Sequence, residues 1–132
     1  MSIPKTVCIV TTTTTVNPSE NISKIKKAIL NILLDAQIEI TNDIVTATAN
    51  IDSLSKIHEV ISSRNTQKAY RRHLDRNLMD DSTWFYLNKQ AAYANTVALC
   101  SESDESPLGP IKIILNSKNI EQLIDWLIVN SR

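Results

Sequence analysis

The chain has 132 residues, of which 42% are hydrophobic, and its 14 basic and 14 acidic residues give a formal net charge of zero. This length suits a single domain spanning residues 1–132, and the apolar content suffices for a buried core. A neutral molecule has no overall field to draw it toward RNA or an anionic membrane, so any electrostatic contact must be local. With Gly109 as its one glycine, the chain lacks the glycine-rich phosphate loops and nucleophile elbows of several large enzyme classes.

Hydropathy and cysteine usage indicate the compartment. No apolar run reaches the roughly 18 residues of a membrane span, and an early Pro4 and Lys5 argue against a signal segment. Cys8 and Cys100 lie far apart in apolar segments without CxxC spacing, as buried reduced thiols do. We therefore expect a cytoplasmic protein that makes no membrane contact.

The residues that could support catalysis or metal binding are scattered. His58 and His73 have no zinc-ligand spacing to each other or to the cysteines. The acidic residues at 80–81 and 102–105 are more typical of solvated surface than of a magnesium site. No nucleophile is paired with a base, so we expect no enzyme, no cofactor and no metal.

Strand and helix signals alternate in the first half of the chain. Residues 5–16 are rich in β-branched side chains, including a threonine run, and predict a strand. Residues 17–34 open with asparagine, proline and glutamate and continue with apolar residues at helical spacing, which predicts a helix. Two β-prone runs, 37–41 and 44–50, flank a turn and predict a hairpin.

The second half begins with two consecutive helices, the first at about residues 54–61 and the second at about 65–78, with asparagine or aspartate at 50 or 52 as the first cap. Strand character then returns three times, and a final apolar helix closes the chain. These last elements are predicted at residues 83–87, 95–100, 111–115 and 120–128. The order is β-α-β-β-α-α-β-β-β-α, an α+β fold.

Three segments together resemble a known archaeal family. They are FYLNKQAAY at Phe85–Tyr93, ESPLGPI at Glu105–Ile111 and LIDWL at Leu123–Leu127. In combination and order they are similar to uncharacterised protein family 0201, whose members are described as RNA-binding domains. The resemblance implies a fold like that of the ribosomal protein that carries 5S rRNA, with helices packed on one side of an antiparallel or mixed sheet. It brings no catalytic residues.

The chain departs from that family after the first segment, where it has Ala94–Asn95 and a glycine is expected near the second position. Asparagine tolerates positive φ better than most residues, so we expect the turn to be kept.

The strongest local charge lies in the second of the two consecutive helices. Five basic residues offset by Asp75 give this segment a charge of +4, so the rest of the chain carries −4. A helix places positions 68, 72 and 76 on one stripe, which could follow a phosphate backbone. The alternative is a solvated face on which Asp75 pairs with a neighbouring arginine. The five basic residues are Arg64, Lys68, Arg71, Arg72 and Arg76.

A second candidate lies within FYLNKQAAY, where Asn88, Lys89 and Gln90 follow an aromatic strand. Amides can read base edges, aromatic rings can stack on unpaired bases, and an exposed Lys89 could assist at phosphates. The alternative is that Phe85 and Leu87 face the core while the amides satisfy backbone groups at the strand end.

ESPLGPI has a similar pair of interpretations. It concentrates the glycine and two of the four prolines within residues 107–110, which predicts a rigid turn leading into the next strand. It is poorly suited to cradle phosphate, since each proline removes a backbone donor.

These features lead to a noncatalytic RNA-binding protein that contacts phosphates through its basic helix, with Lys89 assisting and Asn88 or Gln90 adding base selectivity. Contact with about four phosphates predicts a log–log salt slope of roughly −3. The alternative is a protein-interaction or homodimeric structural domain that uses a sheet face or the helix bearing Trp126 as its interface, without binding nucleic acid.

Overall fold

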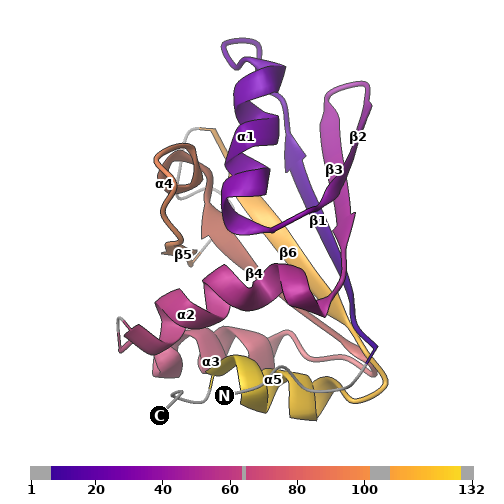
Figure 1. The fold of residues 1–132 in the computed structure, drawn as a ribbon, viewed down its shortest axis with the longest axis vertical. Coiled ribbons are helices and arrows are strands. Elements are labelled where there is room, and N and C mark those ends of the chain that lie inside the picture. The colour runs from indigo at the N-terminus through magenta and orange to yellow at the C-terminus, as the bar shows by residue number, and fades with distance from the viewer. Residues whose placement is uncertain (1–6, 64, 102–107, 129–132) are drawn as a thin grey trace.

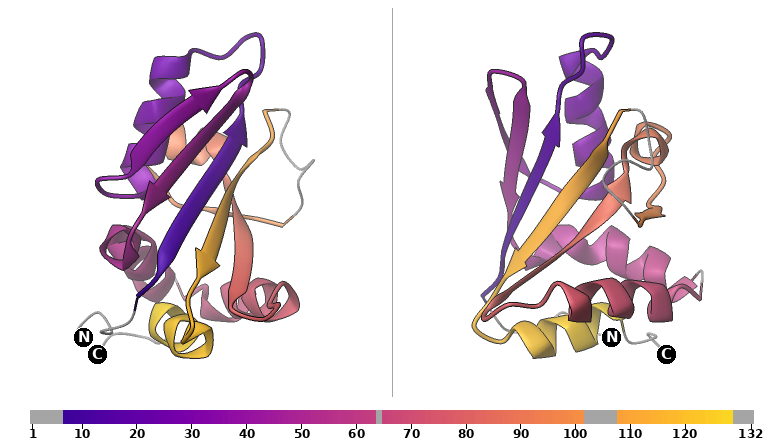
Figure 2. Two further views of the ribbon diagram at one scale, coloured as in Figure 1. Left: turned by 90° about the vertical axis from the view of Figure 1, so that its right-hand side faces the viewer. Right: turned by 180° about the vertical axis from the view of Figure 1, so that it is seen from behind.

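The chain forms a six-stranded sheet whose helices lie over one of its faces (Figures 1 and 2). The computed structural model describes residues 7–63, 65–101 and 108–128. In chain order the elements are β1 (Ile9–Thr15), α1 (Ile22–Ile32), β2 (Gln37–Thr41), β3 (Ile44–Ala49), a 3₁₀ turn (Ile51–Leu54), α2 (Ser55–Ser63), α3 (Gln67–Arg76), β4 (Ser82–Asn88), α4 (Lys89–Tyr93), β5 (Leu99–Cys100), β6 (Pro110–Asn116) and α5 (Ile120–Ile128).

The strands are ordered β2-β3-β1-β6-β4-β5, and every neighbouring pair is antiparallel. The α+β class is confirmed, and of the two sheet types left open by the sequence the antiparallel one is observed. β1 and β6 lie at the centre, so the threonine run of β1 is paired on both edges.

Alternation along the strands divides the sheet into two faces. On the helix-covered face, Val10 and Thr12 of β1, Phe85 and Leu87 of β4, and Ile113 of β6 are buried. The intervening side chains point to the opposite face and are only partly exposed or fully exposed. The view from behind in Figure 2 shows the strands in front of α1, with no helix of the described residues lying over this side of β1 and β6. We call it the open sheet face.

The helices bury apolar stripes against the other face. In α1 these are Ile25, Ala28, Ile29 and Ile32, whereas the buried set of α5 includes Trp126, which stacks on His58 of α2. α2 and α3 follow one another closely, as predicted, and Asn65 between them has a φ of 55°. Asparagine is one of the few residues that adopt this left-handed conformation readily.

The structure departs from the sequence-based expectations at the start of α1, in the length of β5 and in two short helical elements that were not predicted. Helix α1 begins at Ile22 with Asn21 as its cap, whereas residues 17–20 form a turn. β5 is only two residues long, and a short helix, α4, follows β4 directly. A 3₁₀ turn capped by Asn50 precedes α2. At the departure from the family pattern, Asn95 has a φ of 59°, as expected for a residue that replaces glycine.

Candidate nucleic-acid interface

Helix α3 is fixed to the sheet by its buried side, which determines where its basic residues point. Tyr70 and Leu74 are buried, and the Tyr70 ring meets Phe85 of β4 edge to face at 5.7 Å between centroids. The Thr83 hydroxyl donates a hydrogen bond to the Leu74 carbonyl at 2.6 Å. These contacts orient the remaining side of α3 toward solvent.

The solvent side of α3 carries three exposed cations, Lys68, Arg72 and Arg76, which we call the cationic stripe. The Arg76 guanidinium lies 3.1 Å from Nδ1 of His73, whereas Lys68 and Arg72 contact no hydrogen-bond or ion-pair partner within the described part of the chain. The i, i+4, i+8 spacing therefore places three cations along one side of the helix.

Two further arginines of the predicted site, Arg71 and Arg64, are not part of the cationic stripe. Arg71 forms an ion pair with Asp125 of α5 at 3.0 Å, with side chains 39% and 65% exposed. Such an exposed pair contributes little stability. Arg64 lies outside the described residues.

The residues of the FYLNKQAAY segment have three different environments: the core, the cap of a helix and the surface. Phe85 and Leu87 lie in the core, as the alternative interpretation of this segment predicts. The Asn88 side chain accepts a hydrogen bond from the Ala91 backbone at 2.8 Å and caps α4, so this amide satisfies the chain where the strand ends. Gln90 is exposed on α4.

The expectation that Lys89 is exposed is wrong, since none of its side-chain surface is accessible. Its ammonium donates to the Thr15 carbonyl at 2.7 Å and the Leu108 carbonyl at 3.0 Å. It also forms an ion pair with Glu20 at 3.1 Å, and the Glu20 side chain is 3% exposed. An ammonium group can be buried only when acceptors and an opposite charge replace its hydration. Lys89 therefore cannot contact phosphates from this position, and we remove it from the predicted phosphate-binding residues.

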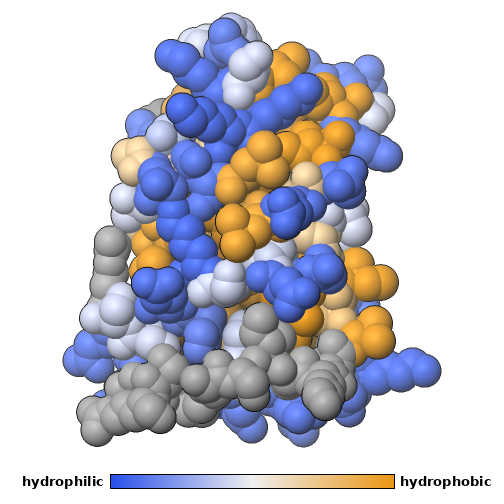
Figure 3. All heavy atoms as spheres, in the orientation of Figure 1, coloured by the Kyte–Doolittle hydropathy of each residue, from blue (hydrophilic) through white to orange (hydrophobic). Residues whose placement is uncertain are grey.

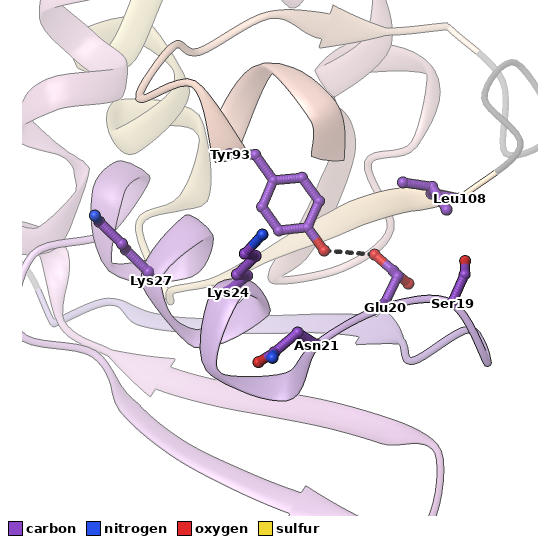
Figure 4. Close-up of a pocket in the computed structure, with 7 residues that line it drawn as sticks. All are labelled: Ser19, Glu20, Asn21, Lys24, Lys27, Tyr93 and Leu108. Atoms are coloured by element: carbon purple, nitrogen blue, oxygen red, sulfur yellow. Dashed lines mark hydrogen bonds between the residues drawn. The ribbon is translucent and has the colours of Figure 1, made fainter.

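Glu20 is the centre of this polar cluster, which was not predicted from the sequence. One carboxylate oxygen accepts from the side-chain amide of Asn17 at 2.7 Å. The other accepts from the Tyr93 hydroxyl at 2.6 Å, the hydrogen bond drawn in Figure 4. The signal for this cluster in the sequence was Lys89, which directly follows an aromatic strand. A lysine that is buried at such a position needs a buried partner for its charge.

The two acids of this cluster keep their ordinary protonation states. Burial acts to raise the pKa of Glu20, but hydrogen bonds from Tyr93, Asn17 and Lys89 outweigh it and lower that pKa. Burial, and then the Glu20 carboxylate, raises the pKa of Tyr93. Both shifts move away from neutrality, whereas a general acid or base works best with a pKa near the operating pH.

A surface pocket of about 500 Å³ opens beside the cluster, lined in part by Tyr93 and Glu20 and by Lys24 and Lys27 of α1 (Figure 4). Neither histidine contributes to its lining. His58 stacks on Trp126 at 4.5 Å between ring centroids, and His73 is buried. Within residues 7–63, 65–101 and 108–128, no three His, Cys, Asp or Glu side chains group as a metal site.

The expected turn at ESPLGPI can be followed from Leu108 onward, because residues 105–107 lie outside the described part. Gly109 has a φ of 78°, a conformation that side chains rarely adopt, and β6 starts at the next residue. The Leu108 and Pro110 carbonyls accept from Lys89 and from Thr14 at 3.0 Å each. The turn thus supplies acceptors rather than the donors that a phosphate needs.

The interface expected on α5 is not available through its tryptophan, because Trp126 is only 7% exposed. Apolar side chains are exposed elsewhere: Leu30 of α1, Leu34 just after it and Ile40 of β2 are 43%, 51% and 37% exposed. Figure 3 shows hydrophobic surface gathered over α1 and the β2–β3 hairpin. No helix in the described residues is long and apolar enough to cross a membrane.

Comparison with known proteins decides the family. A family model described as RNA binding matches residues 9–117. A UPF0201 protein of Methanothermobacter thermautotrophicus is 40% identical over 112 residues, covering 85% of this chain and 84% of that protein. The chain belongs to the UPF0201 family. The resemblance inferred from the sequence is therefore confirmed.

Solved structures of UPF0201 proteins share the fold. One crystal structure of an uncharacterized member has a TM-score of 0.79 at 28% identity, and covers 91% of this chain and 92% of that one. The UPF0201 protein from Methanococcus jannaschii has a TM-score of 0.76 at 28% identity, with 94% and 95% coverage. Neither these names nor the description of the family model specifies a reaction.

Proposed function

We propose that this UPF0201 protein is a noncatalytic RNA-binding protein whose cationic stripe contacts phosphates. The observation that carries the proposal is the exposure of Lys68, Arg72 and Arg76 on one side of α3 in a molecule with no net charge. Basic side chains on one face bind a phosphate backbone through release of its counterions. The RNA-binding description of the family model supports the same ligand.

Arg71 and Gln90 are secondary members of this surface. Because the Arg71–Asp125 pair is exposed, exchanging the carboxylate for a phosphate costs little. Gln90 is exposed and is our candidate for contact with base edges. The side-chain oxygen of Asn88 accepts a hydrogen bond from the Ala91 backbone and caps α4. Arg64 remains a prediction from the sequence.

Removing the cationic stripe tests the proposal. The triple variant Lys68→Gln/Arg72→Gln/Arg76→Gln should weaken binding of a labelled RNA about tenfold or more at moderate salt, measured by fluorescence anisotropy. The matched control is Lys24→Gln/Lys26→Gln/Lys27→Gln in α1, which removes the same number of exposed positive charges from another helix. It should change affinity far less.

Equal losses in the two variants would show that total charge rather than α3 governs binding, and would contradict the proposal. The protein-interaction alternative makes a different prediction. If the wild-type chain binds no RNA and light scattering shows a dimer that the Leu30→Glu variant disrupts, the exposed apolar surface of α1 and β2 is the functional one.

A further inference from the structure

The open sheet face carries an aromatic pair that the cationic stripe does not use. Trp84 and Tyr86 alternate with the buried Phe85 and Leu87 of β4, so they point to the side opposite α3. Their ring centroids are 4.9 Å apart with the planes tilted by 56°, and both residues remain partly exposed.

A cation lies beside this pair, and hydroxyl groups lie farther along the same face on the next two strands. Lys112 of β6 is directly opposite Tyr86, and its ammonium lies 4.5 Å from the centroid of the Trp84 ring. Beyond β6, the register places Thr13 beside Lys112 and Thr11 beside Ile114. The next strand continues both rows with Thr46 and Thr48.

The charge beside the aromatic pair is also favourable for an anion. One row of side chains crosses the sheet from Tyr86 through Lys112, Thr13 and Thr46 to Glu39. Glu39 is the carboxylate of this row, and it lies on the outer strand β2, away from the aromatic pair. Lys112 contacts the Trp84 ring rather than a carboxylate within the described residues. It is therefore available to a phosphate beside the aromatic pair.

A cation–π contact between neighbouring strands can also serve stability alone. What distinguishes this pair is its place on a sheet face that no helix in the described residues covers. Large aromatic side chains there contribute less to burial than they would in the core, whereas every unpaired base offers a π-face that stacks on such rings. On β1, the strand next to β6, the hydroxyls of Thr11 and Thr13 add donors and acceptors for sugars and phosphates.

We propose that the open sheet face is a stacking platform for unpaired bases of single-stranded RNA, built from Trp84 and Tyr86, with Lys112 contacting the adjoining phosphate. This inference rests on the proposed RNA binding and specifies its ligand. Strand β4 links the two surfaces, because α3 packs on its Phe85 side and Asn77, just after α3, donates to the Trp84 carbonyl at 2.9 Å. Duplex RNA keeps its bases stacked on one another and gains nothing from the platform.

The test compares an unstructured RNA with a hairpin of equal length. The Trp84→Leu/Tyr86→Leu variant should weaken binding of the single strand about tenfold or more and leave hairpin binding nearly unchanged. The control Thr46→Ala/Thr48→Ala alters the same face two strands away from Lys112 and should bind both RNAs like wild type. Circular dichroism verifies that each variant is folded.

A second measurement does not depend on the double variant folding. In Trp126→Phe, Trp84 is the sole tryptophan, and stacking of a base on its ring should quench its fluorescence when the single strand is added. The hairpin should quench it much less.

The outcomes separate the two proposals. If the wild-type protein binds neither RNA, both the proposed function and the platform are wrong. If it binds the single strand but the double variant binds equally well and Trp84 is not quenched, only the platform is wrong. A change in oligomeric state of the double variant with unchanged RNA affinity would instead assign this face to a second copy of the chain.

Discussion

At the scale of single residues, two neighbouring threonines of β1 show how the same side chain can stabilise or destabilise the fold. Thr14 is buried and its hydroxyl donates to the Pro110 carbonyl at 3.0 Å. Thr12 is fully buried, and its hydroxyl has no hydrogen-bond partner in the described structure. A buried hydroxyl without a partner loses its hydration without compensation.

Substitution by valine, which has nearly the same shape, should therefore have opposite effects at the two positions. We expect Thr12→Val to raise the free energy of unfolding by about 1 kcal/mol and Thr14→Val to lower it by a similar amount. Urea unfolding followed by circular dichroism measures both changes. Destabilisation by Thr12→Val equal to that of Thr14→Val would show that the Thr12 hydroxyl is satisfied after all.

At the scale of elements, the cluster around Glu20 ties together segments that are distant in sequence. Lys89 at the start of α4 binds the carbonyl at the end of β1 and the carbonyl of Leu108 before β6, while Tyr93 at the end of α4 reaches the carboxylate before α1. Removing one partner from a buried ion pair leaves the other charge uncompensated. The cluster thus anchors α4, which sequence propensity alone did not predict.

Acid should release this anchor. The pKa of Glu20 is lower in the folded chain than its ordinary value of 4.5, so its contribution to stability is present above pH 4.5 and is lost as pH falls through the folded value. The stability difference between wild type and Glu20→Gln should be constant between about pH 6 and 8 and shrink below about pH 4.5. Urea titrations of both proteins across this range measure it.

The same urea titrations provide the control variant and the result that would contradict this prediction. Glu121→Gln, which removes one carboxylate from the exposed surface of α5, is the control for the loss of a single negative charge. A Glu20→Gln difference that persists unchanged well below pH 4.5 would show that the carboxylate is not held in its ionised form.

Local sequence signals were sufficient where the residues of one segment decide its structure. The threonine run, the apolar stripe of α1 and the alternation of Phe85 and Leu87 depend on periodicities that are visible in the chain. The positive φ of Asn95 was likewise expected from residue type. These features gave the α+β class correctly, and the order of the elements except for α4 and the 3₁₀ turn.

Features that depend on distant partners were not accessible in this way. The burial of Lys89 follows from Glu20, which is 69 residues away, and from two carbonyls at the ends of other strands. The start of α1 moved to Ile22 because Asn17 and Glu20 are committed to that cluster. The partly exposed position of Trp84 and Tyr86 depends on which sheet face the helices cover, and that is a property of the tertiary fold.

At the scale of the whole molecule, the net charge is zero, so RNA binding depends on where the positive charges lie on the surface. The cationic stripe of α3 is one local concentration of positive charge, and the open sheet face offers aromatic rings on the other side of β4. Phosphate contact supplies affinity that depends on salt, whereas stacking depends on it much less. The two contributions can therefore be separated in one type of experiment.

The most direct measurement is the salt dependence of RNA binding by the wild-type protein and by Lys68→Gln/Arg72→Gln/Arg76→Gln. With about four phosphates contacted, the plot of log affinity against log salt concentration should have a slope of roughly −3, and the variant should reduce its magnitude by about 2. A flat plot for the wild type, or the same slope for both proteins, would contradict phosphate binding by the cationic stripe.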